Sequence, residues 1–446
     1  MRIATIGLCD PEYAIALATS QYHAALAQLR QSVPELVDAG LQSDESCSGK
    51  AVASLGRQHA ESPFDALVLV QAAWSRPDVL LQVLRAFPRL PMLLFAPGSP
   101  VVDGVIRSTA PAAGVGSTLP ILRRHGIAHK LVWSAPGTVV DEADYLPFLR
   151  ACRARRQLNG IKLGMVGFGD MRLQTTAFDV RELHESFGVE VESIDMLELQ
   201  QGMDALEASE VDRQIAILTA GWQFAGAKPP TAAMRKVIAA YLVLDRIAAE
   251  RGYAGMSIKC PTGVTAAMGF TSCLVGCLLA RKYHYVCEND IPGLLGQVIA
   301  GLLSEQMSTY WELYEILHDG ILFGCCGFCP AEFLAEPVTV RTYEGFLTGL
   351  SCCSRVKAGL YTTLRLGQDP DGRFLLHLAE GQATAPPPWY EDACGPIQHP
   401  SVLFTPDVPP AQFLQHLQAQ HVAVVPGHWG EALREFAAMT GVRVVG

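Results

Sequence analysis

The chain has 446 residues, of which half are apolar and 17% are charged. This length exceeds a single hydrophobic core, so we expect two to four domains with a large buried fraction. The net charge of −10 argues against a nucleic-acid partner, whose binding surface needs clustered Lys and Arg.

Targeting and membrane signals are weak. The N-terminus shows no basic segment followed by an apolar core, so no secretory signal is expected. The longest apolar run, 265–280, is shorter than the roughly 18 residues that span a bilayer. We expect a single buried helix there and no membrane partner. Thirteen cysteines without a secretory signal predict reduced thiols and a cytoplasmic location.

Short apolar strands alternate with helices over the first 160 residues. Such alternation predicts a parallel sheet with helices on both faces. The predicted strands are 2–7, 66–71, 92–95 and 130–133, and the predicted helices are 11–29, 77–86, 117–124 and 145–158.

The same alternation starts again near residue 162 and changes near 335. The second set has predicted strands at 162–167, 189–194, 256–258 and 285–287, with helices at 175–187, 231–251 and 265–280. Beyond 335, the segments 338–341, 359–366 and 373–378 alternate like strands, and 422–445 reads as strand–helix–strand. The expected fold is two doubly wound α/β domains, 1–160 and 161–335, followed by a mainly β, barrel-like domain, 336–446.

An acidic cluster lies where a predicted strand ends and a helix begins, in Cys287-Glu288-Asn289-Asp290-Ile291. Ligands of open α/β sheets bind at this carboxyl edge. Helix capping is the competing interpretation, because carboxylates are favoured at helix N-termini. Both hold together if Asp290 caps the helix and Glu288 is free.

Two further residues complete a candidate metal site, Glu312 after 24 positions and His421 far downstream. Two carboxylates and one imidazole suit a divalent metal with open positions for substrate oxygens. Taken singly, Glu312 would be an ion-paired surface residue and His421 a core histidine, and His428 is a nearby competitor.

Two other motifs were weighed. The segment 164–169 lacks the spacing of a dinucleotide-binding loop, and its glycines instead favour a tight loop that brings Met171 and Arg172 to the sheet edge. The cluster Cys325-Cys326-Gly327-Phe328-Cys329 admits zinc, iron–sulfur or redox chemistry and echoes a motif of heterodisulfide reductases. Its spacing to Cys352-Cys353 fits no zinc ribbon, and we expect no iron–sulfur cluster.

Taken in order, these motifs resemble the L-fucose isomerase superfamily, with the L-arabinose isomerases as wider relatives. The resemblance rests on 287–290, on the acid beside Tyr310-Trp311, and on the terminal Ala419-Gln420-His421. The segments 65–95, 167–199 and 427–430 agree with it. Two positions depart: L-fucose isomerases have Asp where this chain has Glu312, and many relatives have His-Cys-Gly in place of Cys325-Cys326-Gly327.

The resemblance implies an intramolecular oxidoreductase, a metal-dependent aldose–ketose isomerase that acts on a free L-fucose- or L-arabinose-like sugar through a cis-enediol. It implies a divalent metal, Mn²⁺ in many members, held by Glu288, Glu312 and His421, with the two glutamates catalytic. It also implies a homo-oligomer, a hexamer or a trimer, with shared active sites. The residues expected to contact the sugar are Trp74 from a neighbouring subunit, Met171, Arg172, Cys326 and His428.

Three alternatives stay open from the residues. The same metal site would also serve a sugar epimerase. A sugar-binding or regulatory protein with a decayed site is possible on this scaffold, although the three ligand-type residues are all present. The third alternative is a redox or metal protein built on the cysteine cluster.

Overall fold

The computed structural model describes residues 1–446 apart from 11, 44, 227–230, 343–348 and 391–399. The chain forms two compact units, Met1–Arg156 and Gln157–Gly446. The predicted three-domain division at 160 and 335 stays a prediction.

The first unit contains a five-stranded parallel sheet in the order β2-β1-β3-β4-β7. Its three central strands, β1, β3 and β4, are nearly continuous buried runs because helices cover both faces. The strands are β1 (Arg2–Leu8), β2 (Glu35–Gln42), β3 (Ala66–Gln71), β4 (Met92–Ala96) and β7 (His129–Trp133).

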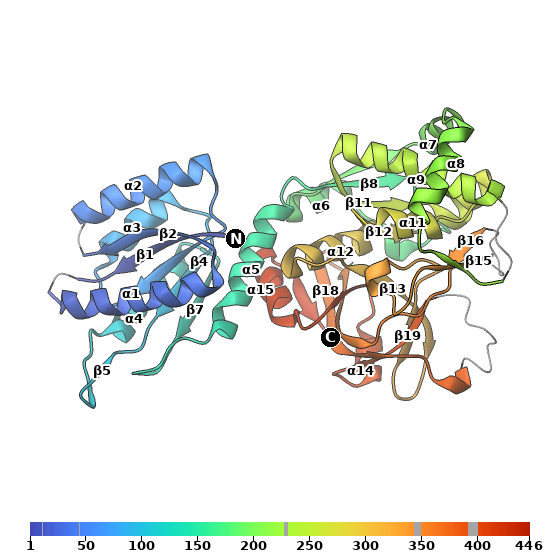
Figure 1. Cartoon of the computed structure of the whole chain (residues 1–446). Coiled ribbons are helices and arrows are strands. Elements are labelled where there is room, and N and C mark those ends of the chain that lie inside the picture. The colour runs from blue at the N-terminus through green and yellow to red at the C-terminus, as the bar shows by residue number, and fades with distance from the viewer. Residues whose placement is uncertain (11, 44, 227–230, 343–348, 391–399) are drawn as a thin grey trace. The chain divides into compact units, whose positions relative to one another are not determined.

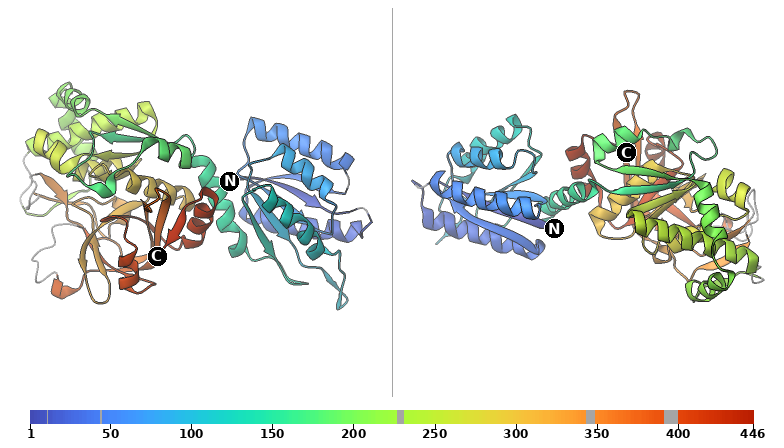
Figure 2. Two further views of the ribbon diagram at one scale, coloured as in Figure 1. Left: turned by 180° about the vertical axis from the view of Figure 1, so that it is seen from behind. Right: turned by 90° about the horizontal axis from the view of Figure 1, so that it is seen from above.

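Amphipathic helices cover this sheet (Figure 2). In α3, proline at the first helical position starts the helix, and Val79, Leu80, Val83 and Leu84 form its buried stripe. The helices are α1 (Ile15–Ser32), α2 (Glu45–Glu61), α3 (Pro77–Ala86), α4 (Pro111–Arg124) and α5 (Glu142–Leu158). A short hairpin, β5 (Val101–Val102) and β6 (Val105–Ile106), extends beyond β4.

The second unit begins with a four-stranded parallel sheet in the order β12-β11-β8-β9. Its strands are β8 (Lys162–Val166), β9 (Glu190–Ile194), β11 (Tyr253–Ile258) and β12 (His284–Cys287). The helices around it are α6 (Val180–Phe187), α7 (Met196–Asp204), α8 (Ala208–Leu218), α9 (Thr231–Arg251), α11 (Cys273–Leu279) and α12 (Ile291–Ser304). A small sheet joins β10 (Gln223–Phe224), β15 (Thr339–Thr342) and β16 (Leu350–Cys352).

Six strands then close into a barrel in the order β17-β20-β13-β14-β19-β18, because β18 pairs back onto β17. They are β13 (Thr309–Ile316), β14 (Ile321–Gly324), β17 (Gly359–Gln368), β18 (Phe374–Thr384), β19 (Ser401–Pro406) and β20 (His421–Pro426). The elements α14 (Pro410–Gln415), α15 (Gly430–Thr440) and β21 (Arg443–Val445) complete the chain. The barrel therefore takes strands from both sides of residue 335, and Glu312 lies on one of them.

Helix α12 joins the sheet to the barrel. It packs against β11 and β12 on one side and against β17 and β20 on the other, as Figure 1 shows. An apolar sequence is buried nearly all round in such a position, which explains why α12 carries almost no exposed side chain. The fold is thus a mixed α/β structure with parallel sheets and a six-stranded barrel toward the C-terminus.

The predicted single helix over 265–280 is wrong. The chain makes a π-helical turn at Cys260–Thr265, a short helix at Ala266–Met268, and then α11 after a left-handed Gly269. The predicted helix 175–187 is likewise split into a 3₁₀ turn, Gln174–Thr176, and α6. Among the described residues no single helix is long and apolar enough to cross a bilayer, and Cys260–Met268 with Cys273–Leu279 passes only as a pair bent by 109°.

The barrel core supplies a stability test. Trp311 is fully buried and its ring packs against Tyr361 at 4.9 Å, with Phe323 and Phe404 nearby. Trp311→Ala should lower the free energy of unfolding by about 3–5 kcal/mol, because the cavity cannot collapse between paired strands. Denaturant titration measures this. Trp389→Ala is the control, since Trp389 is 59% exposed, and equal losses in both variants would contradict the packing described.

Candidate functional site

Glu288 is fixed at the carboxyl edge of the second sheet, directly after β12. Its backbone N–H donates to the Ile258 carbonyl at 3.0 Å. Glu288 and Asn289 both have left-handed backbones, with φ of 64° and 54°. The Asn289 amide donates to the carbonyls of Val166 at 3.0 Å and Phe168 at 3.2 Å, which holds this unusual turn against the end of β8.

The barrel brings Glu312 and His421 to the same place. The two are direct partners in the antiparallel pairing of β13 with β20, so their side chains project from the same face. The Nε2 atom of His421 lies 3.6 Å from Oε2 of Glu288. Ligand-type atoms of Glu288, Glu312 and His421 all lie within 4.8 Å of one another. The three residues predicted as one set are therefore brought together.

Asp290 orients this group. One carboxylate oxygen accepts the Gly293 backbone N–H at 3.0 Å and so caps α12, as predicted. The other accepts Nη1 of Arg365 at 2.5 Å and Nδ1 of His421 at 2.9 Å. A carboxylate only accepts, so Nδ1 of His421 carries the proton, and in the neutral ring the Nε2 lone pair faces Glu288.

Most of the charged groups in the site are buried, with Glu312 half-buried at its margin. Burial raises the pKa of Asp290, but Arg365 and His421 outweigh this and bring it down to about 2. Burial, with smaller contributions from the charges of Glu312 and Asp170, raises the pKa of Glu288 to about 7 against the opposing effect of His421. Burial lowers the pKa of His421, and Asp290, Glu288 and Glu312 together raise it above its ordinary value. The carboxylates therefore attract positive charge.

The donor set fits a divalent cation. Nε2 of His421 is a buried nitrogen without a hydrogen-bond partner among the described residues. An imidazole nitrogen and two carboxylates with space for further oxygens are a common set for Mn²⁺-like ions. Neutral His421 and ionised glutamates are the forms that coordinate metals, and a bound cation would displace protons from both.

Several residues of the site were not predicted from the sequence. Gln420 donates to Oε2 of Glu288 at 3.4 Å and accepts from Thr175 at 2.9 Å. Asp170 is fully buried and accepts from the backbone of Met171 and from Thr262. Asp170 follows the predicted strand 162–167, which is a signal for a sheet-edge residue. Arg365 lies in the middle of a predicted strand and gave no signal.

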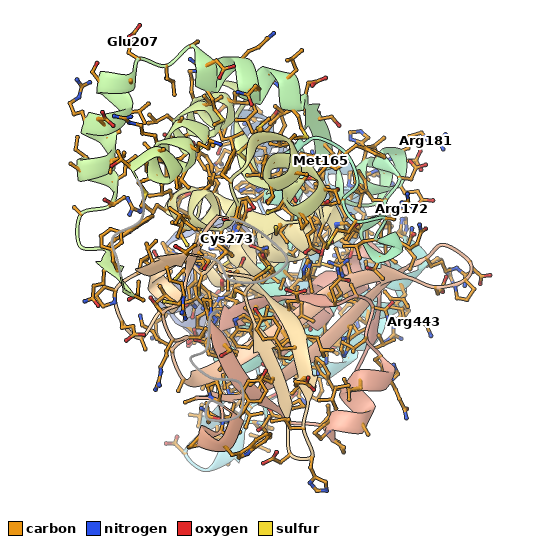
Figure 3. All side chains as sticks on the ribbon, turned by 90° about the vertical axis from the view of Figure 1, so that its right-hand side faces the viewer. Met165, Arg172, Arg181, Glu207, Cys273 and Arg443 are labelled. Carbon is orange, nitrogen blue, oxygen red and sulfur yellow. The ribbon has the colours of Figure 1, made fainter. Side chains whose placement is uncertain are left out.

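Four of the five residues predicted to contact substrate lie in the same unit as the triad, namely Met171, Arg172, Cys326 and His428. Met171 and Arg172 are exposed in the loop after β8, with φ of 44° and 61°, and Figure 3 labels Arg172. Cys326 is half-buried in the loop after β14. Burial raises the pKa of its thiol well above the ordinary value, and the charges of Glu312 and Glu288 raise it further.

Trp74 lies in the other unit, and His428 lies beyond the opposite end of β20 from His421. Trp74 belongs to the first unit, where it is half-buried with its ring 5.9 Å from that of Tyr13. His428 follows the far end of β20, about 17 Å along the strand from His421. Its Nδ1 lies 3.3 Å from Glu380. The pairing of β20 with β13 selects His421, so the structure does not bring His428 to the triad.

The cysteine-rich segment offers no comparable group. In the described part of the chain, the triad is the one set of three or more Cys, His, Asp or Glu ligand atoms close enough to hold an ion. Cys325 donates to the Tyr310 carbonyl at 3.1 Å and is buried, as is Cys329.

Comparison with known proteins agrees with the predicted resemblance. Residues 335–446 match the C-terminal domain of L-fucose isomerase. A sulfoquinovose isomerase of Alkalicoccus urumqiensis is 22% identical over 341 residues, 72% of each chain. Another, of Priestia aryabhattai, is 22% identical and covers 70% of this chain and 71% of its own. A third, of Clostridium sp. (strain MSTE9), is 26% identical over 67% of this chain and 68% of its own.

The Arg365–Asp290 ion pair can be tested directly. Arg365→Met should lower the free energy of unfolding at pH 7 by about 3–5 kcal/mol, because it leaves a buried carboxylate without its cation. In the intact protein the depressed pKa of Asp290 makes its stabilisation complete above pH 4, and it is lost as the pH falls toward 2.

In the variant, buried Asp290 takes up a proton at a higher pH than before. The difference between variant and intact protein should therefore shrink as the pH falls from 7 to 4. Chemical unfolding at several pH values measures it. Arg373→Met is the control, since Arg373 is 75% exposed, and a pH-independent loss would contradict the role given to Arg365.

Proposed function

We propose that this chain, whose C-terminal residues match the L-fucose isomerase C-terminal domain and which is similar to sulfoquinovose isomerases, is a divalent-metal-dependent aldose–ketose isomerase acting on a free monosaccharide. The observation that carries this is the triad. Two carboxylates and an imidazole, from the sheet edge and from the barrel, place their ligand-type atoms within 4.8 Å of one another, and only Glu312 is partly exposed.

The reaction moves a carbonyl from C1 to C2. A carboxylate oxygen of Glu288 or Glu312 removes the proton from C2 and returns it to C1 on the same face of a cis-enediol, while the O2 proton moves to O1. Glu288 suits this exchange because its pKa is raised to about 7 before any cation binds. His421 is held in one orientation by Asp290, so it contributes a fixed lone pair.

Glu288, Glu312 and His421 would hold the cation, for which we propose Mn²⁺. Bound there, it supplies positive charge that stabilises the developing enediolate. Glu288 and His421 are buried and Glu312 is half-buried, so solvent screening is weak on the inner side of the site and this electrostatic effect stays strong there.

The substrate has two candidates. One is a neutral L-fucose- or L-arabinose-like sugar, as the resemblance implies. The other is a sugar that carries a sulfo group, as in the name of the relatives. Arg172 lies in the loop after β8, and Lys259 packs its side chain against Gly167 of the same loop. Both cations follow the carboxyl ends of parallel strands, at the same edge of the sheet as Glu288, and they favour the sulfonated candidate because guanidinium groups bind oxyanions in a bidentate manner.

An aldose panel with added Mn²⁺ tests the function. We expect a ketose product, with deuterium from solvent at C1, and a sulfonated aldose as the better substrate by kcat/KM. An epimeric aldose as the product would point to the epimerase alternative. No turnover of any sugar with several divalent metals would contradict the proposal.

Glu288→Gln should abolish turnover and weaken Mn²⁺ binding, because the substitution removes both a ligand charge and a proton acceptor. We expect a loss of at least about 100-fold in kcat, the scale of a general acid–base group. Glu315→Gln is the control, because Glu315 lies on β13, the strand of Glu312, but has an exposed side chain. Full activity in Glu288→Gln would refute the assignment.

We further propose a homo-oligomer in which Trp74 of one subunit contacts the sugar of another. Trp74→Ala should raise KM while leaving metal content unchanged, at a cost of roughly 1–3 kcal/mol for the lost aromatic surface. In mixed oligomers of Trp74→Ala and Glu288→Gln subunits, about one quarter of the sites should be intact. Each of the two residues is intact in half of the subunits, and random assembly combines them independently. An active monomer, or no regain on mixing, would refute shared sites.

A further inference from the structure

A cluster of thiols lies where the second sheet, α11 and the loop after β14 meet. Cys273 donates to the Cys326 carbonyl at 2.9 Å across this junction, and Figure 3 labels Cys273 between the helices and the barrel. Apart from Cys326, which is expected to contact the sugar, these thiols have no role in the proposed isomerisation. The thiol cluster consists of Cys260, Cys273, Cys277, Cys287, Cys325, Cys326, Cys329 and Cys352.

Within the cluster, Cys260 and Cys287 are the pair next to the triad. Both lie at the paired ends of two neighbouring strands: β12 ends at Cys287, opposite Ile258 at the end of β11, and Cys260 comes two residues after Ile258. Both sulfur atoms also contact Ser272, whose N–H lies 3.4 Å from Sγ of Cys260 and whose Oγ lies 3.6 Å from Sγ of Cys287. Tyr285 fixes that serine by donating to Oγ at 2.8 Å. The two sulfurs are therefore held together by the surrounding structure.

The backbone connects this pair to Glu288. Cys287 is its preceding residue, and the Glu288 N–H donates to Ile258, two residues before Cys260. A disulfide needs a sulfur–sulfur distance of about 2.05 Å, shorter than any thiol hydrogen bond. Closing it would draw the two chain segments together beside a turn that already has two left-handed residues.

We propose that Cys260 and Cys287 form an oxidisable dithiol that a hydroperoxide converts to a disulfide, and that this displaces Glu288 and switches the site off. In the first step the Cys260 sulfur attacks the peroxide O–O bond, giving a sulfenic acid and one water. In the second the Cys287 sulfur attacks the sulfenic sulfur and releases a second water. With hydrogen peroxide, two thiols and H₂O₂ give one disulfide and two H₂O.

Chemistry and position together favour this pair over its neighbours. The hydrogen bond from Cys287, aided by Ser272 and Thr265, lowers the pKa of Cys260 to about 7 against the effect of burial, and the thiolate is the form that reacts with peroxide. The pKa of Cys352, beside Cys277, is also lowered to about 7, but these two residues lie on β16 and α11, and neither is next to a triad residue in the chain. Cys287, by contrast, directly precedes Glu288.

The test treats the purified full-length protein with hydrogen peroxide, blocks remaining thiols under denaturing conditions, and maps disulfides by peptide mass spectrometry. We expect a Cys260–Cys287 cross-link that has lost two hydrogen atoms and that dithiothreitol reverses. Mn²⁺ titration should show weaker binding in the oxidised protein. Isomerase activity should fall by about 100-fold, the scale of a 1 Å misplacement at a reacting centre.

Cys260→Ser should retain the basal activity and metal affinity and should lose the response to peroxide. Cys277→Ser is the matched control in the same cluster and should stay sensitive. The activity change rests on the proposed function, whereas the cross-link and the metal titration need no substrate, so failure of either idea is distinguishable. A cross-link at another pair, oxidation to sulfinic acid only, or unchanged Mn²⁺ binding in cross-linked protein would overturn the proposal.

Discussion

The carboxylate of Asp290 is the interaction on which the site depends. It caps α12, neutralises a buried guanidinium and fixes the imidazole of His421, and it does so with two oxygens. Each partner belongs to a different part of the second unit: α12 to the junction, Arg365 to β17 and His421 to β20. An ionised acid in an apolar interior is tolerated only because all of these donors reach it at once. The group that orients the chemistry is thus also the group that joins the sheet to the barrel.

Arg365 extends this junction to the loop that follows β8. Its second nitrogen donates to the Thr175 carbonyl at 2.7 Å, and the Thr175 hydroxyl donates to Gln420. Gln420 in turn donates to Glu288. A chain of hydrogen bonds therefore connects two members of the triad, from Glu288 through Gln420, Thr175, Arg365 and Asp290 to His421. Rigid support of this kind holds reactive groups in place more reliably than a loop alone.

Features that depend on residues close together in the sequence were predictable, whereas features that depend on distant residues were not. Parallel strands and their helices were predictable because apolar runs and helical periodicity are short-range patterns, and the pairing of Asp290 with α12 is a four-residue motif. The predicted helix over 265–280 failed because apolar composition does not show where Gly269 breaks the chain. The register that sets Glu312 opposite His421 is a pairing across more than one hundred residues. The sequence pattern could suggest the triad only through resemblance, and it gave no sign of Arg365.

The left-handed turn at Glu288 and Asn289 has a consequence for how this sequence can vary. Each such residue costs on the order of 1 kcal/mol or more, and Gly would relieve that cost. Gly at 289 would remove the amide that reaches Val166 and Phe168, and Gly at 288 would remove the acid itself. Substitutions that make the fold more stable here therefore remove what the site is built from. Selection for thermal stability alone would therefore replace residues at this edge of the sheet first, whereas stabilising substitutions in the barrel interior would leave the site intact.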